Sequence, residues 1–377
     1  MEYREFGKTG VQVSALGLGA MRMPTVGEDD NKKVDLEKTV PIIQHALDNG
    51  INYIDSAFGY LNETSEIGVG EGIQGYDRSK IYIATKSHLD VNVAEWRNRL
   101  DTQLKKLKTD YIDFYHLHGL QYREFRKKVV PEGYLKELQK ARDEGLIRHI
   151  SFSCHDSPQN MVKLVETGEF SSILLQYNLL HRITETAIER AKEMGMGVVV
   201  MGPVGGGRLD FLSKLKPREN RTVPELALRF VLADPKVDVV LSGMNSIDMV
   251  SENVRTAADT DPLSTVEQED IQHMMAELKG FDDLYCTGCD YCIPCPNGVN
   301  IPVNFMFMNY ERFYEFDNAN FSAIYHNALK PAGASADDCI DCEECVEKCP
   351  QDIAIPDRLK DVAEYFADKA PVAPNKN

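Results

Sequence analysis

Residues 81–87 read IYIATKS, and residues 110–118 read DYIDFYHLH. Each stretch contains a short apolar run of strand length, and the segment between them, residues 92–106, repeats its apolar side chains with the period of a helix. Two consecutive strands that are joined through a helix pair in parallel. The same alternation of strand and helix extends in both directions from this unit, from about residue 13 to residue 256.

Eight candidate strands lie along this part of the chain, at residues 13–18, 53–55, 81–85, 112–116, 149–153, 173–176, 197–201 and 237–241. Amphipathic helix patterns lie between them, at residues 38–49, 92–106, 133–144, 157–167, 184–194 and 223–232. Eight alternations predict an α/β fold, a closed (β/α)₈ TIM barrel, over residues 1–280. An open doubly wound sheet is the alternative, but the sequence LGLGAM at residues 16–21 has only the first two glycines of its dinucleotide fingerprint.

Nine cysteines divide the chain into a cysteine-poor body and a cysteine-dense tail. Cys154 stands alone, and the other eight lie between Cys286 and Cys349. The first residues, MEYREFGKTG, are polar and unlike a secretion signal. The short, regular cysteine spacings also differ from those of a disulfide scaffold. We therefore expect metal sites in a second domain, residues 281–377.

Two cysteine motifs define this second domain. The first is C-x₂-C-x₂-C-x₂-C-P at residues 286–296, and the second is C-x₂-C-x₂-C-x₃-C-P at residues 339–350. The second motif matches the bacterial ferredoxin run, in which three cysteines bind one [4Fe–4S] cluster and the fourth binds the other cluster. The expected ligand sets are therefore Cys286, Cys289, Cys292 and Cys349 for one cluster, and Cys339, Cys342, Cys345 and Cys295 for the second.

Two zinc sites of the Cys₄ type are the alternative, but such sites usually pair two CxxC turns and do not use cysteine triplets. Both motifs resemble those of dicluster ferredoxin domains. The resemblance implies a small α-helical, bacterial-ferredoxin-like iron–sulfur domain. Residues 301–326, between the motifs, hold eight aromatic side chains, which we expect to pack the tail onto the barrel.

The charge balance restricts the partners. The formal net charge is −17, and residues 281–377 carry 17 acidic and seven basic side chains. This balance argues against nucleic acid as a partner. An acidic iron–sulfur domain suits a basic electron-transfer protein, and an ordinary solvated acidic surface explains the charge equally well. The sequence has no apolar run long enough to span a membrane. The expected iron–sulfur clusters imply a reducing cytosol, so we expect a cytoplasmic protein.

Four chemically distinctive residues stand at or just after the carboxyl ends of three neighbouring strands. They are Asp55, Tyr60, Lys86 and His118. Such strand ends converge on the mouth of a barrel, where catalysis usually takes place. We expect Tyr60 to be a general acid, because reduction of a carbonyl needs a proton on oxygen. In this interpretation Lys86 lowers the pKa of Tyr60, Asp55 holds the lysine, and His118 orients the carbonyl. We interpret the nearby Asp113 and His116 as structural.

These motifs resemble the aldo-keto reductase superfamily, whose members use Asp, Tyr, Lys and His in this order. The resemblance covers about residues 3–256, and the whole architecture resembles aldo-keto reductases that carry a C-terminal ferredoxin-like domain. It implies contacts to a nicotinamide coenzyme from Gly19, Ala20 and Met21, from Ser153, Cys154 and Gln176, and from Pro203, Val204 and Gly206. Cys154 departs from the asparagine usual in the family, and Gln176 lies two residues beyond the usual glutamine.

The segment that binds the adenosine end in the family is matched by Ser242, Gly243, Glu252 and Asn253. Members that bind a 2′-phosphate carry basic residues in this segment, and this chain has none between residues 242 and 253. A 2′-phosphate gains little binding energy without a cationic partner. The sequence therefore favours NADH over NADPH.

Two functions remain open. The first is nicotinamide-dependent reduction of a small-molecule carbonyl, or the reverse oxidation of an alcohol, with two attached [4Fe–4S] clusters. The second is a ferredoxin-linked oxidoreductase whose barrel binds nicotinamide or flavin, with FMN as the candidate, and whose clusters pass electrons to a redox partner protein. A flavin would be the converter between the two-electron chemistry of nicotinamide and the one-electron chemistry of the clusters.

Overall fold

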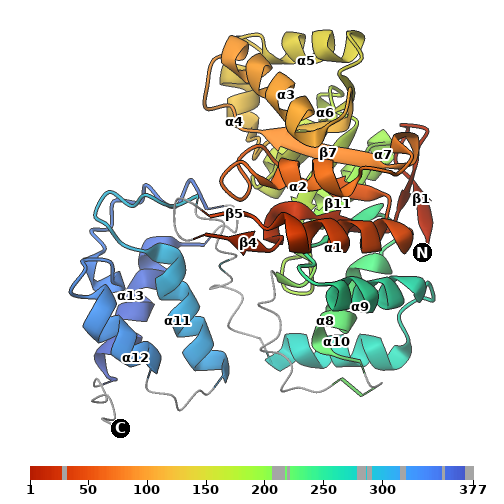
Figure 1. The fold of residues 1–377 in the computed structure, drawn as a ribbon. Coiled ribbons are helices and arrows are strands. Elements are labelled where there is room, and N and C mark those ends of the chain that lie inside the picture. The colour runs from red at the N-terminus through yellow and green to blue at the C-terminus, as the bar shows by residue number, and fades with distance from the viewer. Residues whose placement is uncertain are drawn as a thin grey trace. The chain divides into compact units, whose positions relative to one another are not determined.

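The computed structural model describes residues 1–27, 32–205, 217–218, 221–277, 286, 291–314, 320–349 and 353–369. These residues fall into two compact units (Figure 1). The first ends at Ile271, and the second begins at Gln272, within helix α10 (Thr265–Glu277). The sequence had predicted the boundary near residue 280.

The first unit is a closed barrel of eight parallel strands, which confirms the predicted fold class. Neighbouring strands follow one another around the barrel in the order β10, β11, β12, β3, β6, β7, β8 and β9. Their bounds are β3 Leu16–Gly19, β6 Tyr53–Asp55, β7 Tyr82–Ser87, β8 Ile112–Leu117, β9 Ile147–Cys154, β10 Ser172–Gln176, β11 Gly197–Met201 and β12 Val239–Ser242.

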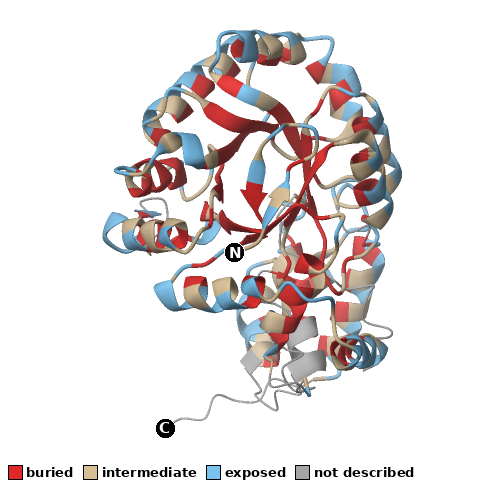
Figure 2. Cartoon of the chain, turned by 90° about the vertical axis from the view of Figure 1, so that its right-hand side faces the viewer, coloured by how far each residue is buried: buried red, intermediate tan, exposed pale blue. Residues whose placement is uncertain are grey.

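Helices surround these strands, and Figure 2 shows buried residues on the strands and on the inner helix faces. The helices are α1 Leu36–Asp48, α2 Ser65–Gly72, α3 Val93–Leu107, α4 Tyr122–Glu124, α5 Tyr134–Asp143, α6 Pro158–Glu166, α7 Glu185–Met194, α8 Val223–Leu232 and α9 Ile247–Ala258. Short turns are η1 Ala20–Arg22, η3 Arg78–Lys80 and η4 Phe125–Val129. The apolar faces of the helices pack against the outward side chains of the strands and form the main core.

The first predicted strand, residues 13–18, is in fact divided at Ala15. Strand β2 (Gln12–Ser14) pairs in an antiparallel hairpin with β1 (Tyr3–Glu5), and only β3 enters the barrel. The hairpin has a packing role, because Phe6 and Val13 belong to the apolar cluster that also contains Phe114 of β8. A second small hairpin joins β4 (Thr25–Val26) and β5 (Lys33–Val34).

Helix α2 was not predicted, because its sequence SEIGVGEG contains three glycines, and glycine is among the poorest helix formers. Packing explains them. A Cβ atom on Gly70 would overlap the carbonyl oxygen of Lys106 in α3, and one on Gly72 would lie 2.7 Å from the side chain of Ile43. Glycine therefore allows α2 to approach its neighbours closely.

The second unit has its own apolar core, built on helices α11 (Ile301–Tyr314), α12 (Asn320–Ile324) and α13 (Ile355–Ala367), with turns η7 (Tyr325–Leu329) and η8 (Ala336–Asp338). The described aromatic residues of 301–326 contribute to this core. Phe305 is buried, and the ring of Tyr325 stacks on Phe366 with centroids 4.4 Å apart. These described rings therefore form part of the second unit's own core. Within the described residues, no helix has the length and apolar character of a membrane span.

A buried ion pair in the first unit joins helices α8 and α10. The side chain of Arg229 in α8 is 2% exposed and pairs with Glu267 of α10 at 3.2 Å. The Arg229 guanidinium also donates to the carbonyl oxygens of Asp259 and Asp261. Removing one partner of such a pair leaves an uncompensated buried charge.

We expect Arg229→Met to lower the free energy of unfolding by about 3 kcal/mol, as measured by urea unfolding. Arg190→Met is the matched control, because Arg190 pairs with Glu166 and Glu193 on the surface and its loss should change little. Equal unfolding midpoints for the two variants would contradict the buried pair's contribution.

Candidate functional site

The structure brings Asp55, Lys86 and His118 together with Tyr60 at one end of the barrel. Asp55 is the last residue of β6, Lys86 lies near the end of β7, and His118 follows β8 directly. The ammonium group of Lys86 lies 5.1 Å from the centre of the Tyr60 ring, and the rings of Tyr60 and His118 meet edge to face with centroids 5.9 Å apart. The four residues therefore form one cluster, as the sequence predicted.

The centre of this cluster is a buried ion pair. Lys86 is 1% exposed, and its Nζ donates to Asp55 Oδ1 at 2.5 Å and to the carbonyl oxygen of Ser56 at 2.8 Å. Burial lowers the pKa of Lys86, and the charge of Asp55 opposes that lowering. The pair holds the ammonium in one fixed position below the Tyr60 ring.

The loop that carries Tyr60 is fixed to the neighbouring strand. The backbone N–H of Ser56 donates to Ala84, and that of Phe58 donates to Lys86, both at 2.9 Å. Directly after Tyr60, Leu61, Asn62 and Glu63 all have left-handed backbone angles, with φ between 51° and 62°. Such angles are costly for residues other than glycine, and they persist only where the surroundings enforce them.

The pKa of Tyr60 differs from the sequence expectation. Lys86 was expected to lower it, but burial, followed by the charge of Asp55, raises the pKa of this phenol above its usual value of 10. In the protein without coenzyme, Tyr60 is therefore a neutral hydroxyl group at pH 7. A protonated phenol suits a proton donor.

His118 is held as a neutral imidazole. Its ring stacks on that of His88, with centroids 3.9 Å apart. Burial lowers the pKa of His118 well below 6.5, and the neighbouring His88 and Lys86 add to this effect. Burial and the charge of Lys86 also lower the pKa of His116 to about 3. A neutral His118 can still donate one hydrogen bond to a carbonyl oxygen.

Most of the residues expected at the coenzyme lie at or just after strand ends around the same mouth. Gly19 ends β3 and lies beside Asp55 on one side, while Ser242 at the end of β12 lies beside β3 on the other. Met21 is 57% exposed and Ala20 is buried. Ser242 accepts a hydrogen bond from Asn253 at 2.9 Å, and Glu252 is exposed. Pro203 is buried, Val204 is half-buried, and Gly206 lies outside the described residues.

Ser153 and Gln176 point into the barrel, but Cys154 does not. The Ser153 hydroxyl accepts from the Gly119 N–H at 2.9 Å, and Gln176 lies beside Gly202, where a Cβ atom would be 3.7 Å from Gln176 Cδ. Successive side chains of a strand point to opposite faces. Cys154 accordingly belongs to the core outside the barrel strands, and burial raises the pKa of its thiol. The structure therefore separates Cys154 from the mouth.

The mouth also contains three further histidines. His88 and His155 directly follow β7 and β9, and His181 follows β10. Burial lowers the pKa of both His155 and His181 to about 4. The rule that identified His118, a polar residue just past a strand end, would have found His88 and His155 as well. These neutral imidazoles add hydrogen-bonding groups around His118.

Two buried polar atoms of the mouth, a carboxylate oxygen and a ring nitrogen, are available to a ligand. Within the described residues, neither Asp55 Oδ2 nor His118 Nδ1 has a hydrogen-bond partner, although both atoms are buried. Buried polar atoms are normally paired. A ligand with polar atoms in the mouth would meet this need.

Within the described residues no three cysteine, histidine or acidic side chains form a group that could hold a metal ion, so the crossed assignment of the cysteines stays a prediction. Cys345 lies close enough to Cys339, Cys342 and Cys295 for their thiols to act on it, and burial raises the pKa of Cys345 to about 11. Cys295 belongs to the first motif, and the crossed assignment predicts that it completes the ligand set of the second triplet. Cys289 lies outside the described residues, whereas Cys286, Cys292 and Cys349 contact the unit's core.

Backbone geometry around Cys342 also fits an iron–sulfur cluster. Asp341 and Glu343, on either side of it, have φ angles of 57° and 60°. Backbone that alternates into the left-handed region turns N–H groups towards one point, as at many iron–sulfur sites. The side chain of Asn297 donates to the carbonyl oxygen of Asp338 at 2.7 Å, which ties the two motifs together.

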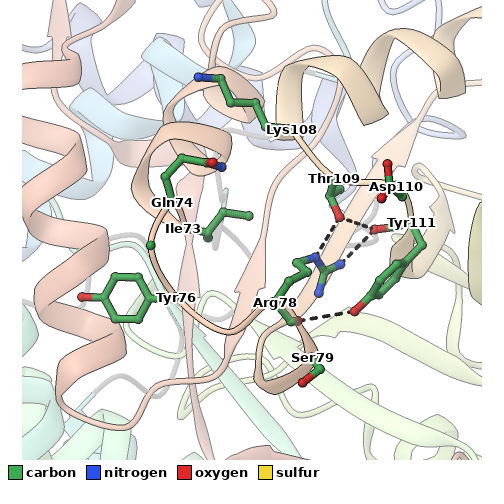
Figure 3. Close-up of a pocket in the computed structure, with 10 residues that line it drawn as sticks. Ile73, Gln74, Tyr76, Arg78, Ser79, Lys108, Thr109, Asp110 and Tyr111 are labelled. Atoms are coloured by element: carbon green, nitrogen blue, oxygen red, sulfur yellow. Dashed lines mark hydrogen bonds between the residues drawn. The ribbon is translucent and has the colours of Figure 1, made fainter.

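A pocket at the opposite end of the barrel has a structural explanation. It is lined by residues that precede β7 and β8, among them Arg78 and Tyr111 (Figure 3). Arg78 donates to Thr109, to two carbonyl oxygens and to Asp113 at 2.7 Å. Asp113 also pairs with Arg148 at 3.1 Å. The guanidinium is satisfied within the fold, which agrees with the structural interpretation of Asp113.

Comparison with known proteins matches two family models. The model described as "Aldo/keto reductase family" matches residues 15–275, and the one described as "4Fe-4S dicluster domain" matches residues 285–354. The chain is 27% identical over 318 residues to L-galactose dehydrogenase of Arabidopsis thaliana, covering 75% of this chain and 96% of the relative. It is 26% identical over 323 residues to the uncharacterized oxidoreductase YqkF of Bacillus subtilis, covering 76% of this chain and 98% of the relative.

Among solved structures, aldo-keto reductase AKR11C1 from Bacillus halodurans in its holo form matches with a TM-score of 0.62 and 29% identity. The match covers 73% of this chain and 96% of that chain. The 73% of this chain that the match covers is about the length of the barrel unit.

Proposed function

Because the chain belongs to the aldo/keto reductase family and carries a 4Fe-4S dicluster domain, we propose that it is a nicotinamide-dependent oxidoreductase that reduces a small-molecule carbonyl or oxidises the corresponding alcohol. The observation that carries this proposal is the ion pair of Lys86 and Asp55 at 2.5 Å, beside Tyr60 and His118. The dicluster domain holds two [4Fe–4S] clusters in this proposal.

The nicotinamide coenzyme, when bound, supplies the hydride that the carbonyl carbon accepts. Tyr60 Oη donates its proton to the carbonyl oxygen, so that an alcohol forms and the tyrosine becomes a phenolate. The ammonium of Lys86, 5.1 Å from the ring centre, stabilises that phenolate, and Asp55 keeps the ammonium in place. Neutral His118 donates a hydrogen bond to the same oxygen and orients the carbonyl. Solvent returns the proton to Tyr60.

The coenzyme contacts proposed from the resemblance are Gly19, Ala20 and Met21 after β3, Ser153 and Gln176 on the inner face, Pro203, Val204 and Gly206 after β11, and Ser242, Gly243, Glu252 and Asn253 after β12. Their support is that the described members lie around one mouth.

A first test of the proposed activity is oxidation of NADH or NADPH, followed at 340 nm, with a panel of aldehydes and ketones. No turnover with any carbonyl or alcohol would contradict the proposed activity.

We expect the KM for NADH to be lower than the KM for NADPH, because residues 242–253 carry no cation. One arrangement works against this preference. Arg22 is exposed, and its Cδ atom lies 3.1 Å from the position of a Cβ on Gly243. Steady-state kinetics with NADH and with NADPH show which coenzyme has the lower KM. A much lower KM for NADPH would refute the preference and make Arg22 the candidate partner of the 2′-phosphate.

The second candidate function is a ferredoxin-linked oxidoreductase whose clusters pass electrons to a partner protein. The dicluster domain favours it, because an iron–sulfur cluster moves single electrons. This function needs a converter such as FMN in the barrel. The absorption spectrum of anaerobically purified protein separates the two functions. Flavin bands above the iron–sulfur absorption favour the second, and their absence favours the first. Either function suits the reducing cytoplasm, where free thiols persist.

A further inference from the structure

A cluster of four polar side chains lies behind the mouth, in the otherwise apolar layer between strands and helices. It consists of Glu66 of α2, Thr85 of β7, Gln103 of α3 and Tyr115 of β8, all 0% exposed. Because successive strand residues point to opposite faces, Thr85 points towards the helices and Lys86 points into the barrel. The proposed mechanism uses none of these four residues.

Glu66 is the centre of this cluster. Its Oε1 atom accepts from Thr85 Oγ1 at 2.5 Å and from Gln103 Nε2 at 2.6 Å. Tyr115 completes the chain by donating to Gln103 Oε1 at 2.6 Å. Glu66 Oε2 has no hydrogen-bond partner within the described part of the chain. Burying a carboxylate is costly unless a positive charge compensates it.

Two cations face Glu66. They are Lys106 and Lys86. Burial raises the pKa of Glu66; the hydrogen bonds from Thr85 and Gln103 oppose that rise most, and the charges of the two lysines add to this opposition. Lys106 already has another carboxylate, because it lies 3.5 Å from the exposed Glu63. Lys86, in contrast, is buried. Asp55 lies on the inner face of the barrel strands, and Glu66 lies between the strands and the helices.

The cluster also contacts the backbone that carries the ammonium. Gln103 Nε2 lies 3.3 Å from the carbonyl oxygen of Lys86, and Thr85 is the preceding residue. The same carbonyl oxygen accepts from the N–H of Phe58, which is part of the loop leading to Tyr60. A movement of Glu66 would therefore reach both Lys86 and Tyr60.

We propose that Glu66 is a positioning residue for the reduction site: through Thr85 and Gln103 it fixes the backbone of Lys86, and its negative charge supports the Lys86 ammonium from the side opposite Asp55. The inference rests on the proposed function. Replacing Glu66 with glutamine keeps the shape and one acceptor but removes the charge. Without that charge the ammonium is less favourable, so the pKa of Lys86 falls.

The test compares Glu66→Gln with Glu63→Gln, which removes an exposed carboxylate from the same segment. We expect Glu66→Gln to lower kcat about tenfold at pH 7 and to move the alkaline limb of kcat down by about one pH unit, with the KM for coenzyme nearly unchanged. Glu63→Gln should leave the profile unchanged. A folded Glu66→Gln protein with the wild-type pH profile would overturn the proposal.

A second measurement needs no turnover and no coenzyme. Lysine labelled with ¹³C at Cε gives a signal for Lys86 that is absent from Lys86→Met, and its titration follows the ammonium directly. We expect the titration to move to lower pH in Glu66→Gln, and to return in Glu66→Asp, which keeps the charge. An unchanged titration overturns the inference even when the wild type reduces carbonyls. A shifted titration in a protein without reductase activity supports the coupling while the proposed function fails.

Discussion

Replacing Tyr60 with phenylalanine is expected to lower kcat for carbonyl reduction about 10³-fold, while the KM for coenzyme changes by less than about threefold. The substitution removes only the hydroxyl group, so the ring that lies over Lys86 and against His118 remains. Burial raises the pKa of Tyr60, so the wild-type phenol carries its proton at pH 7. The variant has no acid at this position.

No other residue of the cluster can take over this role at pH 7. Burial lowers the pKa of His118 well below 6.5, so that its imidazole is already neutral. Lys86 is buried against Asp55, and its ammonium already donates to Asp55 and to the carbonyl oxygen of Ser56. Proton delivery therefore depends on Tyr60.

Tyr76→Phe is the matched control for this substitution. The hydroxyl group of Tyr76 donates to Asp48 at 2.8 Å on the outside of the barrel, next to the pocket of Figure 3. Its loss should leave kcat unchanged. A Tyr60→Phe enzyme with near wild-type kcat would show that the proton comes from elsewhere and would end the assignment of Tyr60 as the acid.

The sequence was sufficient for the barrel and for its mouth because both follow simple periodic rules. Each strand is a short apolar run, and each catalytic candidate stands at a strand end, where a parallel barrel must bring such residues together. The resemblance to the family, and not the strand pattern, suggested Cys154 as a coenzyme contact, and the structure places it in the outer core. Its neighbour Ser153 faces inward, so alternation alone turns Cys154 towards the helices.

Helix α2 and the charge cluster behind it could not be read from local patterns. Three glycines argue against a helix, and only the position of Lys106 in α3 explains why Gly70 must lack a side chain. A glutamate in this segment would be expected at the surface, but in the folded protein Glu66 is fully buried. Its buried position depends on contacts with Gln103 and Thr85, which are 37 and 19 residues away in sequence.

The crossed ligand assignment predicts the second large effect. Cys295→Ala should remove one whole cluster, lowering the iron content of anaerobically purified protein from about eight to about four atoms per chain. Cys295 belongs to the first motif, yet it lies near Cys345 of the second. Its loss should therefore abolish the same electron paramagnetic resonance signal of the reduced protein as Cys345→Ala does.

Cys154→Ala separates a ligand effect from a general effect of losing a thiol. Cys154 is buried in the core of the barrel unit, so this variant should keep all of its iron. Two results would contradict the crossed assignment: full iron content in Cys295→Ala, or loss of the signal that Cys286→Ala removes in place of the one that Cys345→Ala removes. Because each cluster in this arrangement takes ligands from both motifs, the chain must bring residues 286–296 and 339–350 together before either cluster has four thiolates.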